Sequence, residues 1–279
     1  MIEDYIKLGK YNKLEVYKEV DFGVYLRSNE ENDEVLLPKK YVPLNTKIGD
    51  ILEVFVYSDS EDRYIATTKT PKAVLDEFDI FEVVDISKFG AFVEWGLEKH
   101  LFVPLSTQKK NLKKGDKVIG KIKYDKTTDR LFLDAKISRN LKKAKNFKKN
   151  DKVEIFVLAK TPLGYKVIVN NNYEGMIFDN EIFEDIRIGD KKVAYIKINR
   201  DDGKLDVSLQ PIGNRDYVYN KVLDKLTDLK STKITSKSDA DIIKKEFGVS
   251  KKAYKSALQK LKSDNLIIIL EDEIKRIFN

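Results

Sequence analysis

Hydrophobic and polar residues alternate with a period of two up to about residue 213, in short runs separated by polar turns. Strict alternation puts one set of side chains on each face of an extended strand, so this part of the chain is expected to form short strands. Residues 117–124 show the pattern, with apolar side chains on one face and Lys117, Lys121 and Lys123 on the other. From residue 214 the period becomes helical. The pattern therefore predicts a mainly β chain with an α+β part at its C-terminus.

Two sequence markers recur three times at matched spacings. The first is a tetrapeptide with glycine in second place, at residues 22–25, 89–92 and 163–166. The second is a Gly-Asp turn, at residues 48–50, 114–116 and 188–190. Each turn precedes an alternating strand, a polar turn and a final strand. This repetition predicts three β-units of roughly 65–75 residues. With about five strands each, they are expected to be small closed barrels, because closure removes exposed sheet edges.

The C-terminal part predicts three helices and a hairpin. Apolar positions from Val218 to Leu229 mark the first helix, Ser238 or Asp239 can cap the second, and Gly248 is placed to end it. Ser250 can cap a third helix, and residues 266–278 are typical of a hairpin around an acidic turn. This order resembles a winged helix, which would present the lysines on the exposed side of the third helix to nucleic acid. These candidate residues are Lys251, Lys252, Lys255 and Lys262.

The winged-helix part has a second interpretation, as a module for packing or for contacting protein. Glu271, Asp272 and Glu273 at the tip of the hairpin would repel phosphate, which disfavours reading of duplex DNA. The sequence alone does not decide between nucleic-acid binding and a packing or protein-contact role.

The expected domains are residues 1–69, 70–143 and 144–213, one barrel each, and residues 214–279, the winged helix. A short helix is expected between the first two barrels, from Thr70-Pro71 to Phe78, because proline is well tolerated in a first helical turn.

Composition excludes several classes of function. The 279 residues include no cysteine, so disulfides, thiolate metal sites and cysteine nucleophiles are ruled out. His100 is the single histidine, which excludes a histidine-rich metal site. No phosphate-binding glycine loop or metal-ligand cluster is evident, so no catalytic residue, metal or cofactor is expected. The charged N-terminus and the lack of an apolar run of about 20 residues predict a cytoplasmic protein without a membrane partner.

Positive charge is concentrated in the middle of the chain. Residues 1–78 carry 11 basic and 16 acidic side chains, whereas residues 109–152 carry 17 basic and 5 acidic ones. A lysine-rich proteome would explain many lysines but not their clustering. The clustering favours a surface that follows a phosphate backbone.

Residues 88–95 contain two phenylalanines on either side of a glycine. A bulge at Gly90 would bring Phe89 and Phe92 to one outer face, with Ala91, Val93 and Trp95 pointing inward. Exposed rings next to lysines and Arg130 would suit stacking on nucleobases. The alternative is that both rings belong to the core, and these eight residues alone leave the choice open.

Several motifs in residues 88–136 resemble the S1 RNA-binding domain, an OB-fold barrel. They are Phe-Gly-x-Phe-Val-Glu, Leu-Phe-Val-Pro, Lys-x-Gly-Asp-x-Val, Lys-Ile-x-x-Asp and Arg-x-x-Leu. The resemblance implies stacking roles for Phe89 and Phe92, with Asp125 and Arg130 beside them. The histidine often found in the family's middle strand is replaced by Pro104 here, and His100 lies four residues earlier.

The other two repeats match the S1 pattern less well. The first keeps Phe22, Tyr25 and Arg63, and the third keeps only Tyr165, out of register, so it is expected to be a spacer. The full set of candidate RNA-binding residues is Phe22, Tyr25, Arg63, Phe89, Phe92, His100, Lys117, Lys121, Lys123, Asp125, Arg130 and Phe132.

Three S1-like repeats followed by a winged helix are similar throughout to the bacterial conserved virulence factor B family. The resemblance implies a non-catalytic RNA-binding protein that regulates virulence-gene expression after transcription. The expected partner is single-stranded RNA, with structured RNA or DNA as a further partner of the winged helix. The alternative is a winged-helix transcription factor in which the barrels are accessory modules.

Overall fold

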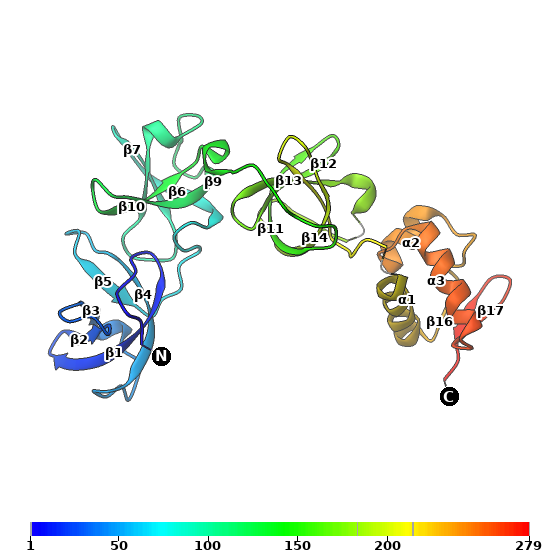
Figure 1. Cartoon of the computed structure of the whole chain (residues 1–279), viewed down its shortest axis with the longest axis horizontal. Coiled ribbons are helices and arrows are strands. Elements are labelled where there is room, and N and C mark those ends of the chain that lie inside the picture. Colours follow the sequence, from blue (N-terminus) through cyan, green and yellow to red (C-terminus); the bar gives the residue numbers. More distant parts are fainter. Residues whose placement is uncertain (1, 183, 214, 279) are drawn as a thin grey trace. The chain divides into compact units, whose positions relative to one another are not determined.

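The computed structural model (Figure 1) describes residues 2–182, 184–213 and 215–278. The chain divides into two compact units, residues 1–141 and 142–279, which are described separately below. The expected start of the winged helix, Asn214, lies outside the described residues. Among the described residues, no helix is both long and apolar enough to span a membrane.

The described part of the chain contains three closed five-stranded barrels, as the repeats predicted. Barrel 1 comprises β1 (Tyr11–Val20), β2 (Gly23–Arg27), β3 (Glu34–Pro38), β4 (Ile51–Ser58) and β5 (Tyr64–Thr67). Barrel 2 comprises β6 (Phe78–Ser87), β7 (Gly90–Glu94), β8 (Leu101–Pro104), β9 (Lys117–Asp125) and β10 (Arg130–Asp134). Barrel 3 comprises β11 (Lys152–Thr161), β12 (Gly164–Val169), β13 (Tyr173–Phe178), β14 (Lys191–Asn199) and β15 (Leu205–Ser208). Four short 3-10 turns follow the third strand of each barrel and the last strand of barrel 2: Lys39–Tyr41, Leu105–Thr107, Ile137–Asn140 and Asp179–Glu181.

The Gly-Asp marker recurs because it ties each barrel together at the same place. In barrel 2 the amide of Gly115 donates to the carbonyl oxygen of Val83 at 2.8 Å, beside a bulge in β6. The Asp116 carboxylate accepts a hydrogen bond from the amide of Lys113 at 3.1 Å. The glycines of the three markers have φ angles of 94°, 86° and 95°, which glycine adopts without a Cβ clash. The first strand of every barrel has its bulge at the matching position.

The bulge predicted at Gly90 is wrong. Ser87 pairs directly with Gly90, so Lys88 and Phe89 form a two-residue turn between β6 and β7. Phe89 therefore lies in a turn, not on a strand face. The glycine is needed for close packing instead, because a Cβ at residue 90 would lie 2.3 Å from the carbonyl oxygen of Val103. Gly23 and Gly164 face the equivalent carbonyl oxygens at 2.2 and 2.0 Å, which explains the recurring tetrapeptide.

The helix predicted from residue 70 to residue 78 is also wrong. The segment is irregular, because its amides bond to other parts of unit 1 rather than to residues four positions earlier. The amide of Lys72 donates to Trp95, and the amide of Leu75 donates to Gly9, each at 2.8 Å. Local sequence signals could not reveal these distant partners.

Barrels 1 and 2 share a hydrophobic core within their unit. Phe55 and Tyr57 lie on the outer face of β4 and are buried among residues of barrel 2. The Trp95 ring meets both of them edge-on, with centroid distances of 5.8 and 6.2 Å. The prediction that Ala91 and Val93 point inward is confirmed. Trp95 is buried as well, but it lies beyond the end of β7 and contacts the outer face of barrel 1.

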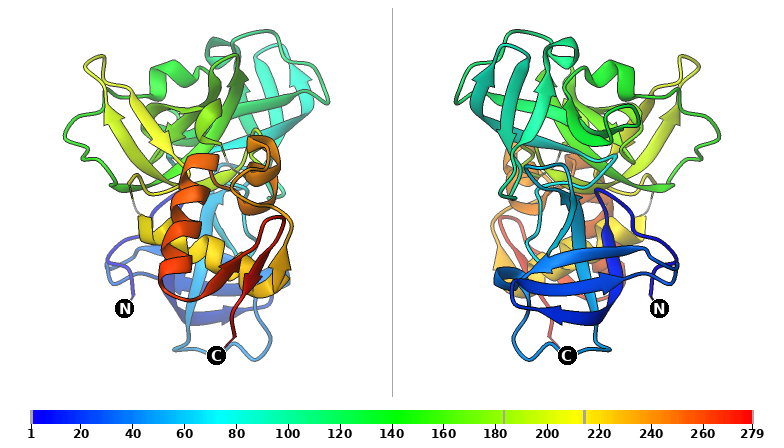
Figure 2. Two further views of the ribbon diagram at one scale, coloured as in Figure 1. Left: turned by 90° about the vertical axis from the view of Figure 1, so that its right-hand side faces the viewer. Right: turned by 90° about the vertical axis from the view of Figure 1, so that its left-hand side faces the viewer.

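The C-terminal part forms three helices and a hairpin, as predicted, and a short strand that was not predicted completes a three-stranded sheet. The elements are α1 (Arg215–Leu229), β16 (Ser231–Thr232), α2 (Ala240–Phe247), α3 (Lys251–Ser263), β17 (Ile267–Ile269) and β18 (Ile274–Arg276). Ser250 caps α3 by accepting a hydrogen bond from the amide of Ala253 at 3.2 Å, and Gly248 ends α2 with φ 60°. The β17–β18 hairpin lies beside α3 (Figure 2), where Tyr254 and Leu258 pack into the shared core.

Candidate nucleic-acid interface

Strand pairing in barrel 2 aligns three phenylalanines across neighbouring strands. Phe92 of β7 pairs with Phe102 of β8, and Phe102 pairs with Phe132 of β10. Paired residues on adjacent strands point to the same side of a sheet. The three rings, here called the phenylalanine row, therefore lie side by side. The Phe92 and Phe102 centroids are 5.2 Å apart.

The phenylalanine row is on the outer surface of the barrel. Its three rings are partly exposed and do not belong to the buried cluster of barrel 2, which takes the alternate residues of the same strands. Those alternate residues are Ala91, Val93, Leu101, Val103 and Leu133. Phe89 in the adjoining turn is 67% exposed. The interpretation of Phe89 and Phe92 as core residues therefore does not hold.

The phenylalanine row lies in a cleft of about 970 Å³. Polar side chains around the rings give the cleft an excess of positive charge: Lys99, Lys126, Arg130 and Arg139 against Asp62 and Asp125. Flat apolar rings beside cations suit a ligand that has both aromatic bases and phosphates.

The structure brings six of the predicted residues together in this cleft: Phe89, Phe92, His100, Asp125, Arg130 and Phe132. Asp125 shapes the turn between β9 and β10, because its carboxylate accepts hydrogen bonds from the Thr127 amide at 2.9 Å and the Thr128 hydroxyl at 2.8 Å. These two donors hold the pKa of Asp125 below its usual range. This β9–β10 turn also contains Lys126, which lies at the edge of the cleft.

The three predicted lysines of β9 have separate environments. Lys123 pairs in register with Phe132, at one end of the phenylalanine row, and its ammonium lies 3.6 Å from the Asp76 carboxylate. Lys121 is only 4% exposed, and its ammonium lies over the Phe78 ring at 5.4 Å. Lys117 is exposed at the start of the strand. None of these three lysines lines the cleft.

The predicted residues of barrel 1 do not join the cleft. Phe22 lies in a turn and is 58% exposed. The Lys18 ammonium lies over the Tyr25 ring, 5.5 Å from its centroid, and Arg63 forms an ion pair with Asp59. The strand register places Tyr25, Leu36, Ile65 and Tyr57 in the row that matches the phenylalanine row. Tyr57 in that row is 4% exposed, because barrel 2 covers it.

Barrel 3 has no aromatic ring in the matching row. Its register aligns Lys166, Met176 and Asp206 instead. Of the three barrels described, barrel 2 is therefore the one whose row of exposed rings can stack on bases.

Sequence reasoning missed Phe102, Lys99, Lys126 and Arg139. Phe102 lies within the Leu-Phe-Val-Pro motif, and its alternation with Leu101 was a usable signal for an outward ring. The two lysines and Arg139 reach the cleft from loops and from a turn after β10, for which the strand pattern gives no signal.

The four predicted lysines of α3, which are Lys251, Lys252, Lys255 and Lys262, are all exposed. At the tip of the hairpin, Glu273 pairs with Lys275 at 3.1 Å. The helix face is basic, whereas the hairpin beside it carries acidic residues at its tip.

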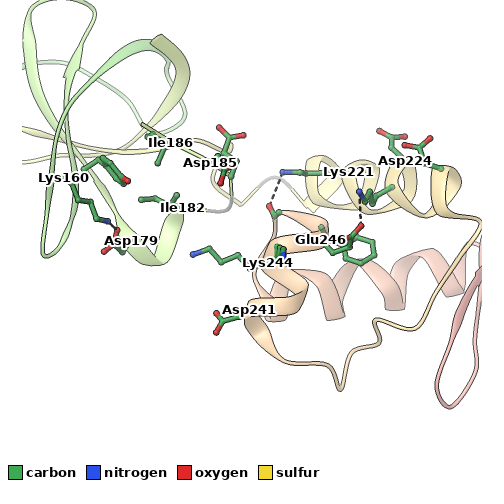
Figure 3. Close-up of a pocket in the computed structure, with 17 residues that line it drawn as sticks. Lys160, Asp179, Ile182, Asp185, Ile186, Lys221, Asp224, Asp241, Lys244 and Glu246 are labelled. Carbon is green, nitrogen blue, oxygen red and sulfur yellow. Dashed lines mark hydrogen bonds and ion pairs between the residues drawn. The ribbon is translucent and has the colours of Figure 1, made fainter. Parts of the chain in front are cut away.

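A second cleft of about 980 Å³ lies in the other unit, between barrel 3 and the helices α1 and α2 (Figure 3). Its described lining residues include seven carboxylates against five lysines. Several of the lysines are already engaged: Lys160 with Asp179, Lys225 with Glu246 and Lys221 with the Gly248 carbonyl oxygen. Burial lowers the pKa of Lys221. The two clefts are nearly equal in volume, so volume does not distinguish them. The excess of cations makes the cleft in barrel 2 the better match for phosphate. Among the described residues, no group of three or more His, Asp or Glu side chains could hold a metal ion.

Comparison with known families agrees with the fold. An S1 domain matches residues 8–69, an S1 RNA binding domain matches residues 82–158, and a CvfB-like winged helix domain matches residues 220–275. The chain is 28% identical to the uncharacterized protein YitL of Bacillus subtilis over 271 residues, covering 92% of this chain and 89% of YitL. It is 24% identical to conserved virulence factor B of Staphylococcus haemolyticus over 260 residues, covering 88% of this chain and 83% of that protein.

A solved structure of a multidomain protein with nucleic acid binding domains from Streptococcus pneumoniae is 25% identical. The match covers 97% of this chain and 98% of that chain, with a TM-score of 0.41. The family matches and relatives confirm the predicted resemblance: the chain has S1 domains and a CvfB-like winged helix domain, and it resembles the conserved virulence factor B proteins along most of its length.

Proposed function

We propose that this S1-domain protein is a non-catalytic, RNA-binding regulator that holds single-stranded RNA in the cleft of barrel 2. Bases stack on Phe92, Phe102 and Phe132, while Arg130 and Lys126 contact phosphates. The observation that carries the proposal is the register of barrel 2, which aligns three surface rings inside a basic cleft. The match of residues 82–158 to an S1 RNA binding domain supports RNA as the ligand.

A single strand suits the phenylalanine row better than a duplex does. Duplex bases are stacked on one another, so their faces are not available to protein rings, whereas unstacked bases present both faces. Ser60 and Ser106 also line the cleft, and their hydroxyls have the donor and acceptor that a ribose 2′-OH needs.

The regulatory role is supported by the relatives named conserved virulence factor B. We place the protein in the cytoplasm, where it would regulate gene expression after transcription by occupying RNA. The lysines of α3 offer a second, weaker contact to structured RNA or DNA.

The alternative function is transcriptional regulation through duplex DNA read by α3. The exposed lysines on that helix favour it, and the acidic tip of the neighbouring hairpin opposes it. The two proposals place the main binding surface in different units of the chain.

The experiment that separates them is a titration of the full chain with one sequence as single-stranded RNA, single-stranded DNA and duplex DNA, at two salt concentrations. We expect the tightest binding to the single-stranded RNA and the weakest to the duplex. Tightest binding to the duplex, lost on removal of residues 214–279, would contradict the proposal and support the alternative.

Lys126→Gln is expected to reduce the salt dependence of RNA binding. Each phosphate contact on a single strand contributes about −0.7 to the slope of log K against log salt, so losing one contact should make the slope shallower by about 0.7. Fluorescence anisotropy at several salt concentrations measures the slope. Lys114→Gln is the matched control, because Lys114 is exposed in a turn and does not line the cleft. Equal slopes for the two variants would show that Lys126 does not contact a phosphate.

A further inference from the structure

One wall of the cleft in barrel 2 is supplied by barrel 1. Ser58, Ser60 and Asp62 of the β4–β5 hairpin line the cleft together with residues of barrel 2. The hairpin turn is held by Asp59, whose carboxylate accepts hydrogen bonds from the amides of Glu61 and Arg63 at 2.9 and 3.0 Å. The wall is therefore a structured turn.

The same hairpin is tied to barrel 2 on both sides of its tip. The Lys99 ammonium donates to the carbonyl oxygen of Asp59 at 2.6 Å. The Tyr64 hydroxyl donates to the Asp129 carboxylate at 2.9 Å. These bonds keep the tip of the hairpin at the edge of the cleft.

Asp62 binds two of the cations in the cleft. Its carboxylate accepts a hydrogen bond from the Lys99 ammonium at 2.9 Å and forms an ion pair with the Arg130 guanidinium. The Lys99 and Arg130 side chains hold the pKa of Asp62 below its usual range, so the carboxylate is ionised at neutral pH. Two of the four cations that line the cleft therefore already have a counter-ion.

A phosphate group can replace this carboxylate. A carboxylate is planar and a phosphate is tetrahedral, but both are oxyanions that accept charge-assisted hydrogen bonds from arginine and lysine. All three side chains remain partly exposed, with 32–56% of their surface accessible. Exposed ion pairs contribute only about 0–1 kcal/mol each, so an arriving phosphate meets a weak competitor.

We infer that Asp62 occupies the place of an RNA phosphate before RNA binds, and that RNA binding transfers Lys99 and Arg130 from the Asp62 carboxylate to the phosphate backbone. This inference rests on the proposed function. The row of barrel 1 that matches the phenylalanine row is partly covered and is not expected to stack bases. Through Asp62, barrel 1 instead lowers the affinity of the site in barrel 2 for RNA. A ligand must displace Asp62 before it gains both cations.

The test is Asp62→Asn in the full chain, titrated with a single-stranded RNA oligonucleotide. We expect binding to tighten about 3- to 10-fold, because two weak ion pairs no longer compete. The salt slope should also steepen, by up to about 0.7, because in the wild type the displaced Asp62 carboxylate takes up a salt cation, which offsets part of the counter-ion release from the RNA. Asparagine tolerates the φ of 62° at this position, so the turn is retained. Asp62→Gly also fits that φ and should give the same gain.

Glu61→Gln is the matched control. It lies in the same turn, changes the net charge by the same amount and is not part of the cleft. We expect its affinity to stay within about twofold of the wild type, because a solvent-exposed charge outside the cleft is screened by salt.

Equal affinities for Asp62→Asn and Glu61→Gln, with RNA binding by the wild type still dependent on Phe92, would overturn the inference and leave the proposed function standing. Weaker binding by both Asp62 variants would also overturn it, because the carboxylate would then assist binding. Failure of the wild type to bind RNA at low salt would remove the proposed function and the inference together.

Discussion

Replacing Phe92 and Phe132 together by alanine is expected to weaken the binding of single-stranded RNA by about 2–6 kcal/mol. Stacking of a base on an aromatic side chain contributes roughly 1–3 kcal/mol, and the two rings lie on different strands with Phe102 between them. Each ring is therefore positioned for a different base. Fluorescence anisotropy with a labelled oligonucleotide measures the loss, and circular dichroism checks that the variant is folded.

Phe22→Ala is the control for this substitution. Phe22 is an exposed phenylalanine of barrel 1, and its removal leaves the cleft unchanged. We expect its affinity to match the wild type. A folded Phe92→Ala/Phe132→Ala variant that binds RNA within twofold of the wild type would contradict the stacking mechanism.

Gly90→Ala is expected to lower the free energy of unfolding by about 1–3 kcal/mol, in the range for overpacked sites. The added Cβ would lie 2.3 Å from the Val103 carbonyl oxygen and 2.8–2.9 Å from two atoms of the Phe102 ring. The backbone oxygen belongs to a paired strand and cannot move alone, so β7 and β8 must separate. Chemical denaturation measures the loss of stability.

The same variant should also weaken RNA binding, because the Phe102 ring must move. Gly115→Ala separates the two effects: nothing lies within 4 Å of its Cβ position, but its φ of 86° strains any other residue. We expect Gly115→Ala to lose stability through backbone strain and to keep its RNA affinity once folded. Loss of affinity in both variants to the same extent would mean that stability alone explains the effect.

The barrels and the winged helix could be predicted because their signals are local. Alternation, the Gly-Asp turn and the cap at Ser250 each lie within a few residues of the structure they specify. The same local signals misplaced Phe89, since the pairing of Ser87 with Gly90 makes it a turn residue. They also predicted a helix after Pro71, where the amides bond to distant segments.

The cleft itself could be predicted only in part. Phe92, Asp125 and Arg130 lie in recognisable motifs, and the structure brings them together. The contribution of barrel 1 depends on contacts between residues far apart in the chain, such as the ion pair of Arg130 with Asp62, 68 positions earlier. The burial of Tyr57 under Trp95 is of the same kind, and it covers a ring in the row of barrel 1 that matches the phenylalanine row. Sequence periodicity carries no information on such contacts.

The most direct test of the phenylalanine row as the RNA site is photochemical crosslinking of the full chain to a single-stranded RNA containing 4-thiouridine, followed by mass spectrometry of the crosslinked peptides. We predict crosslinks in the peptides that contain Phe92, Phe102 and Phe132. Crosslinks confined to residues 240–276, with none in barrel 2, would contradict the account and move the binding surface to the winged helix.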